Sequence, residues 1–187
     1  MAERKLKPTE IFDVESIRHP IIETTTESQL KYKEIENGGK WLMFINKSKL
    51  DEVWEKCCKL YDEGQLTGVS NIRSSTNYKI PKNRFSNKTG VIRFYCVPSA
   101  NNETEIMEIG KNILKLIPYQ SDSGYMTYKS DEQTKRGTRQ TGQKINHLYK
   151  LEVPRRLPAE DFDKMIKDFA ALKTGPSSTK KDFTQNK

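Results

Sequence analysis

The chain has 187 residues and a formal net charge of +8, with 34% hydrophobic and 31% charged residues. These values fit one domain of roughly 130 residues with looser ends and one modest core. No apolar run reaches the ~18 residues that a membrane span needs, and the N-terminus does not resemble a signal peptide, so we expect no membrane partner.

The first half of the chain predicts a strand, a helix and a second strand. Residues 40–45, KWLMFI, are apolar on both faces, which is typical of a central strand. Ser48 is a candidate N-cap for a helix whose apolar stripe runs through the residues Leu50, Val53, Trp54, Cys57, Leu60 and Tyr61. Residues 67–75 form the next predicted strand, and a long polar loop follows it.

The second half predicts three more strands and a second internal helix. In residues 91–97, Ile92, Phe94 and Cys96 alternate with Arg93 and Tyr95, so the two sets lie on opposite faces of a strand. Asn101 or Asn102 caps a helix with an isoleucine stripe that Pro118 ends. Residues 124–130 and 147–153 are strands joined by a polar loop.

The order of these elements predicts an α+β fold in which both internal helices cover one face of a single sheet. We expect a partly ordered arm at residues 1–29, an α+β domain at 30–153, a C-terminal amphipathic helix within 154–172, and a disordered basic tail at 173–187. The odd count of three cysteines without a spaced pattern indicates reduced thiols and a cytoplasmic or nuclear location.

The positive charge is concentrated in two segments. From Thr67 to Tyr95, 29 residues contain no Asp or Glu and carry six Lys or Arg. Residues 129–150 carry a net charge of +4, so the rest of the chain sums to −2. Between residues 40 and 130 the two internal helices hold nearly all of the acids, so this pattern indicates a polyanion-facing surface on the sheet face that the helices leave open.

The stretch GKWLMF, the helix LDEVWEKCCKLYDEGQLTG and the strand after it resemble the basophilic-leukaemia-expressed-protein family, a domain of unknown function. That family resembles the cap-binding translation initiation factor, which implies a curved, mostly antiparallel sheet with helices on its convex back. Cap-binding proteins hold a methylguanine between two tryptophans. This chain has only Trp41 and Trp54, and Trp54 belongs to the helix stripe, so the sequence does not predict that sandwich.

A fainter resemblance, through Gly39–Lys40–Trp41, is to the bacterial phosphothreonine lyases. It implies a phospho-processing enzyme, and Leu42 stands where those enzymes carry a histidine. An elimination needs an acid and a base on opposite sides of the leaving phosphate, and the sequence supplies no complete set. We therefore leave open whether the protein is an enzyme. The two histidines, His19 and His147, are far apart in sequence, so we expect no metal and no cofactor.

Two classes of function besides the enzyme follow from these observations. A binding module for RNA, nucleotide or another phosphorylated ligand would use the basic open face, because arginine contacts phosphate and an aromatic ring stacks on a base. A protein-interaction scaffold would use the C-terminal helix or the Trp54 helix. The predicted ligand-binding residues are Lys40, Trp41, Arg73, Arg93, Tyr95, Lys129, Arg136 and Arg139.

Overall fold

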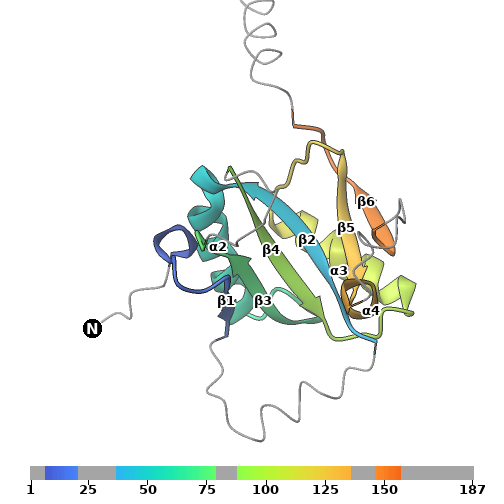
Figure 1. Ribbon diagram of the computed structural model, residues 1–187. Helices are drawn as coiled ribbons and strands as arrows, with labels where there is room; N and C mark the ends of the chain where they lie inside the picture. The colour runs from blue at the N-terminus through green and yellow to red at the C-terminus, as the bar shows by residue number, and fades with distance from the viewer. Residues whose placement is uncertain (1–6, 21–36, 79–87, 136–145, 157–187) are drawn as a thin grey trace, which may run out of the picture. The chain divides into compact units, whose positions relative to one another are not determined.

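A computed structural model of the chain describes residues 7–20, 37–78, 88–135 and 146–156 (Figure 1). The described helices are η1 (Pro8–Glu10), α2 (Lys47–Asp62), α3 (Glu103–Leu116) and α4 (Asp131–Lys135). The strands are β1 (Ser16–His19), β2 (Gly39–Asn46), β3 (Val69–Ser75), β4 (Thr89–Cys96), β5 (Tyr125–Ser130) and β6 (Tyr149–Glu152). None of the helices in the described ranges is long and apolar enough to cross a membrane.

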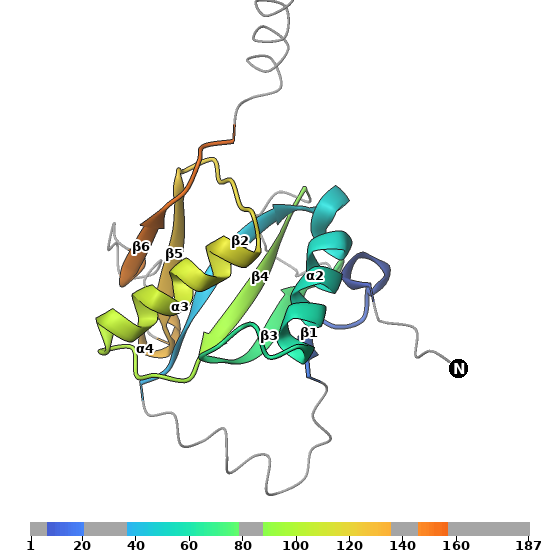
Figure 2. The same ribbon diagram turned by 180° about the vertical axis from the view of Figure 1, so that it is seen from behind.

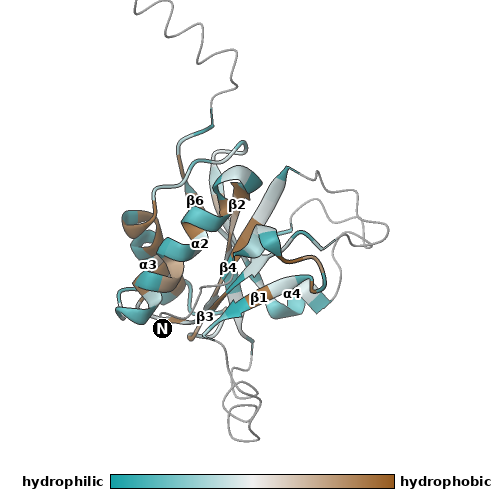
Figure 3. Cartoon of the chain, turned by 90° about the vertical axis from the view of Figure 1, so that its left-hand side faces the viewer, coloured by the Kyte–Doolittle hydropathy of each residue, from teal (hydrophilic) through white to brown (hydrophobic). Residues whose placement is uncertain are grey.

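The six strands form one sheet in the order β1-β3-β4-β2-β5-β6, and every neighbouring pair is antiparallel. The apolar strand β2 lies between β4 and β5, which confirms its predicted central place. The edge-on view shows α2 and α3 on the same side of the sheet (Figure 3). The predicted α+β fold, a curved antiparallel sheet with helices on one face, is confirmed.

The core lies between this sheet and the two long helices (Figure 2). Each helix turns its predicted stripe inward, with Leu50, Trp54 and Cys57 buried on α2 and Ile106, Ile109 and Ile113 buried on α3. The sheet supplies Trp41, Met43, Ile72, Ile92, Phe94, Met126 and Tyr128. Alternation along each strand therefore leaves the second face of the sheet to a different set of side chains.

The helix caps agree with the sequence in one case and differ in the other. Asn102 caps α3, and its side-chain oxygen accepts a hydrogen bond from the Glu105 amide. The predicted cap of α2 is wrong, because Asn46 and not Ser48 holds that position, and its side chain accepts the Ser48 amide at 3.1 Å. Both asparagine and serine can make this contact, so the composition of the turn did not distinguish them.

The N-terminal segment contributes a strand that the sequence analysis did not foresee. Residues 16–19 form β1 at the edge of the sheet, in register with Ile72 to Ser75 of β3. The Thr9 amide donates to the Asp51 carboxylate at 3.0 Å, which ties η1 to α2. On the helix side of β1, His19 contacts the Asp62 carboxylate at 2.6 Å.

The predicted domain boundaries remain a prediction. The described elements belong to one unit, Met1–Arg155. Residues 154–156 are not helical, and Arg155 forms an isolated bridge with Ser121. The remainder of the predicted C-terminal helix and the predicted basic tail lie outside the described residues.

Candidate anion-binding face of the sheet

The face of the sheet opposite α2 and α3, called here the open face, is turned toward the viewer in Figure 1. The strand positions that alternate with the core residues lie on it. Its basic strand residues are Arg18, Lys40, Arg73, Arg93, Lys129 and Lys150. Among the described residues, the one acidic residue at the strand positions of this face is Glu152, the register partner of Tyr125. The predicted basic character of this face agrees with these positions.

Three arginines lie side by side across neighbouring strands of this face, and they are called here the arginine row. In the register, Arg18 of β1 is opposite Arg73 of β3, and Arg73 is opposite Arg93 of β4. The row continues to Leu42 of β2. Neighbouring strands are about 4.8 Å apart, so the row brings three arginine residues side by side on one face of the sheet. Like charges in directly opposed positions destabilise a sheet.

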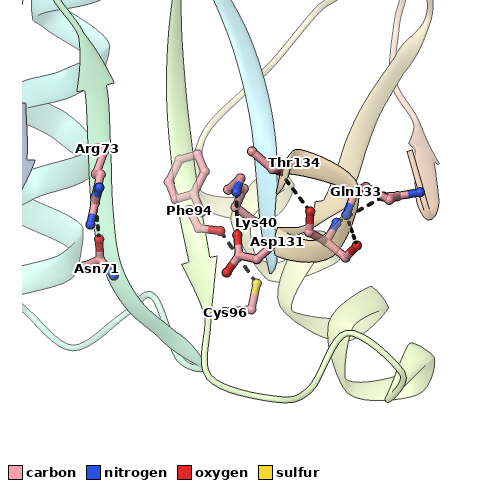
Figure 4. Close-up of polar contacts among 9 residues, drawn as sticks. Lys40, Asn71, Arg73, Phe94, Cys96, Asp131, Gln133 and Thr134 are labelled. Atoms are coloured by element: carbon pink, nitrogen blue, oxygen red, sulfur yellow. Dashed lines mark hydrogen bonds and ion pairs between the residues drawn. The ribbon is translucent and has the colours of Figure 1, made fainter. Parts of the chain in front are cut away.

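Arg73 and Arg93 differ in what surrounds them. Arg73 donates from Nε to Asn71 Oδ1 at 3.4 Å (Figure 4). Its guanidinium carbon lies 4.9 Å from the centre of the Tyr95 ring. Arg93 makes no hydrogen bond or ion pair to any of the residues that the structure describes, and it is half-buried. No carboxylate within the described ranges therefore neutralises Arg93.

Lys40 lies in the next row of the open face, between Tyr95 of β4 and Lys129 of β5. Only 6% of this lysine is exposed, and its ammonium forms an ion pair with the Asp131 carboxylate at 2.5 Å. The ammonium also lies 5.2 Å from the centre of the Tyr95 ring, a cation–π distance. Lys40 is thus a buried, paired lysine, in contrast to Arg93.

The partner of Lys40 comes from α4, a short helix that the sequence analysis treated as part of a polar loop. The Ser130 hydroxyl accepts the Gln133 amide, and the Gln133 side chain accepts the Ser130 amide, both at 3.1 Å. These reciprocal contacts form a capping box. The pattern Ser-x-x-Gln directly after the β5 strand is the signal that would have predicted a helix start, and with it the place of Asp131.

Both tryptophans lie in the core. Trp41 is 0% exposed and donates from its indole nitrogen to the Ile106 carbonyl at 3.0 Å, and Trp54 is 4% exposed. Trp41 is therefore a core group in this structure, in place of the ligand contact that the sequence analysis assigned to it. The strand alternation explains this, because Trp41 follows Lys40 and faces the helices. Neither indole is available on the open face to stack on a ligand.

The other predicted site residues separate into two groups. Arg73, Arg93, Tyr95, Lys40 and Lys129 share the open face, as the strand register shows. Arg136 and Arg139 lie outside the described residues, so their predicted role stays a prediction.

The described residues offer neither a cluster of metal ligands nor an exposed cysteine. Within the described ranges, no three His, Cys, Asp or Glu side chains gather as metal ligands. Leu42, at the position of the lyase histidine, faces Arg93 in the sheet register. The cysteines are buried, and burial raises the pKa of the Cys96 thiol to about 12. A neutral, buried thiol is a poor nucleophile.

No protein family profile matches the chain, and no curated protein does. Among solved structures, a schistosome eIF4E complexed with m7GpppG and 4E-BP is 17% identical to this chain with a TM-score of 0.43. The match covers 62% of this chain and 59% of the schistosome chain. Ascaris suum eIF4E-3 with m7G cap is 16% identical with a TM-score of 0.40, covering 61% and 57% respectively. The chain thus spans less than two thirds of the length of these structures. The resemblance to the basophilic-leukaemia-expressed-protein family stays a prediction.

Proposed function

We propose that the protein binds single-stranded RNA, or a smaller phosphorylated ligand such as a nucleotide, on the open face of its sheet. The observation that carries this proposal is the arginine row. Arg73 and Arg93 lie in direct opposition, which weakens the fold, and no hydrogen bond or ion pair among the described residues neutralises Arg93. Phosphate oxygens are suitable partners, because arginine donates two parallel hydrogen bonds to them.

The geometry of the row favours an extended anion over a single small ion. Arg18, Arg73 and Arg93 come from three adjacent strands, so their charges follow a line across the sheet. A nucleic acid strand that crosses β1, β3 and β4 would place successive phosphates along this line. Electrostatic contacts of this kind are independent of sequence, and they release counterions when they form.

Tyr95 gives this surface a flat aromatic group beside the arginines. The guanidinium carbon of Arg73 lies 4.9 Å from the centre of the Tyr95 ring, within cation–π distance. RNA-binding sheets use aromatic rings and arginine planes to stack unpaired bases. We assign to the Arg73–Tyr95 pair the contact with a base, and to Arg93 the contact with a phosphate. An RNA ligand would agree with the cytoplasmic or nuclear location predicted from the sequence.

The test measures binding of a fluorescent oligouridine RNA by anisotropy at several salt concentrations. Arg93→Ala should weaken binding by about 1–3 kcal/mol, the range for a hydrogen bond to a charged group. Tyr95→Ala should weaken it by about 1–3 kcal/mol if a base stacks there. Lys56→Ala is the matched control, because Lys56 is an exposed lysine on α2 and lies on the other side of the sheet.

The same experiment separates the alternatives. A wild-type protein that binds neither RNA nor nucleotide at low salt would remove the proposal and favour the protein-interaction scaffold. Equal losses for Arg93→Ala and Lys56→Ala would show that binding depends on net charge and not on the open face. Release of phosphate from a phosphopeptide would instead support the enzyme.

A further inference from the structure

The ion pair between Lys40 and Asp131 lies next to the arginine row, on the face to which the proposed function assigns phosphate binding. Lys40 is buried, while 41% of the Asp131 side chain is exposed. The carboxylate thus approaches the lysine from the solvent side of the open face. Tyr95 connects the two cationic groups, since both Lys40 and Arg73 lie over its ring.

Asp131 is held in this position by the backbone and by its neighbours. Its amide donates to the Gly38 carbonyl at 2.8 Å, and the capping box of Ser130 and Gln133 fixes the first turn of α4. The Thr134 hydroxyl donates to the Ser130 carbonyl at 3.0 Å. Figure 4 shows the contacts of Gln133 and Thr134 beside the ion pair. The carboxylate is therefore placed on Lys40 by local structure and needs no ligand to bring it there.

We propose that Asp131 occupies a phosphate subsite at Lys40 and lowers the affinity of the open face for phosphorylated ligands. This inference rests on the proposed function and adds an internal competitor to it. A carboxylate oxygen and a phosphate oxygen accept the same hydrogen bond from a lysine ammonium. The Asp131 oxygen at 2.5 Å from the lysine nitrogen marks the place that a phosphate oxygen would take.

The competition has a direct consequence for ligand binding. While Asp131 holds Lys40, a bound strand gains contacts to the arginine row but not to this lysine. Removal of the Asp131 charge makes Lys40 available, and it adds one phosphate contact. On a single strand, each such contact changes the slope of log affinity against log salt by about −0.7. The affinity and the salt slope should therefore change together.

The experiment compares three variants with the wild type, using the labelled oligouridine RNA at about 50 and about 200 mM KCl. Asp131→Asn removes the competing charge and keeps the side-chain shape. Glu132→Gln is the matched control, because it makes the same charge change at the next residue of α4, which is exposed. The double variant Lys40→Met with Asp131→Asn has the net charge of the wild type and lacks the pair.

Asp131→Asn should tighten RNA binding at least about threefold more than Glu132→Gln does. A threefold change in affinity corresponds to the upper part of the range of energies of one partly exposed ion pair. The salt slope of Asp131→Asn should be steeper by about 0.7. The double variant should bind RNA as the wild type does. Equal gains for Asp131→Asn and Glu132→Gln would overturn the inference, and so would a gain that persists without Lys40.

A second measurement separates this inference from the proposed function and controls for folding. Each variant is melted with and without inorganic pyrophosphate, and the shift in melting temperature is recorded. Pyrophosphate should stabilise Asp131→Asn more than Glu132→Gln, whether or not RNA binds. If the wild type binds no RNA but this difference appears, the RNA proposal fails and the subsite stands. If RNA binds but neither RNA nor pyrophosphate distinguishes the two variants, only the subsite fails.

Discussion

Replacing Arg93 should make the protein more stable while it weakens ligand binding. Arg93→Gln removes the charge and keeps most of the side-chain stem. Arg93 lies directly opposite Arg73, and no hydrogen bond or ion pair joins it to the described residues. The substitution therefore relieves one like-charge cross-strand pair and breaks no hydrogen bond or ion pair of the described part of the chain.

The expected gain follows from the energy of such pairs. Opposed side chains in a sheet contribute about 0.2–1 kcal/mol, with an unfavourable sign for like charges. The free energy of unfolding should rise by about that amount, and the melting temperature by up to about 4 °C for a protein of this size. The repulsion is electrostatic, so the gain should fade at about 1 M salt, where the screening length is about 3 Å.

The assay is urea and thermal unfolding of wild type, Arg93→Gln and the control Lys56→Gln at about 10 mM and about 1 M NaCl. The control removes one charge from the exposed side of α2 and reports the effect of net charge alone. A loss of more than about 1 kcal/mol in Arg93→Gln would refute the reasoning, because it would reveal a folded-state partner for this arginine. A gain of equal size at both salt concentrations would refute its electrostatic cause.

Three further predictions concern the core. Trp54→Ala should lower the free energy of unfolding by about 3–5 kcal/mol, measured by urea unfolding, because it empties a buried site under the sheet. Gly110→Ala should destabilise by about 1–3 kcal/mol in the same assay, since a Cβ there would lie 2.6 Å from the Trp41 ring. An unchanged stability would mean that α3 shifts freely. Cys96, whose pKa burial raises to about 12, should react with iodoacetamide at pH 8 only after unfolding; rapid labelling of the folded protein would contradict its burial.

The local elements of the fold followed from the sequence because their signals are local. The alternation of Ile92, Phe94 and Cys96 with Arg93 and Tyr95 predicted the two faces of β4, and the structure has the first three residues buried. The stripe on α3 and its Asn102 cap were visible within one segment. Period-two and period-3.6 patterns of this kind report which side of an element is buried, and they need no knowledge of the partner.

The parts that were missed depend on pairing between distant segments or on a short motif. β1 has four residues and no clear alternation, and its partner β3 is more than 50 residues away in sequence. Strand pairing at such a separation has no local signature. For the same reason Arg18 was absent from the predicted site. Asp131 lies in a segment predicted as loop, because α4 has only five residues and its Ser-x-x-Gln start is a short signal.

The charges of the open face are distributed unevenly, and this determines where a ligand would bind first. On the β2–β5 side, Asp131 pairs with Lys40, and Glu152 lies in register with Tyr125. On the β1–β3–β4 side, the arginine row has no acidic strand residue on the same face in the described residues. A phosphate meets two carboxylates among the lysines on one side, and on the other it meets three arginines, of which Arg93 has no hydrogen bond or ion pair among the described residues. A polyanion should therefore approach over β3 and β4. Lys40, near the start of β2, stabilises the fold through its ion pair and becomes a ligand contact only when Asp131 is displaced.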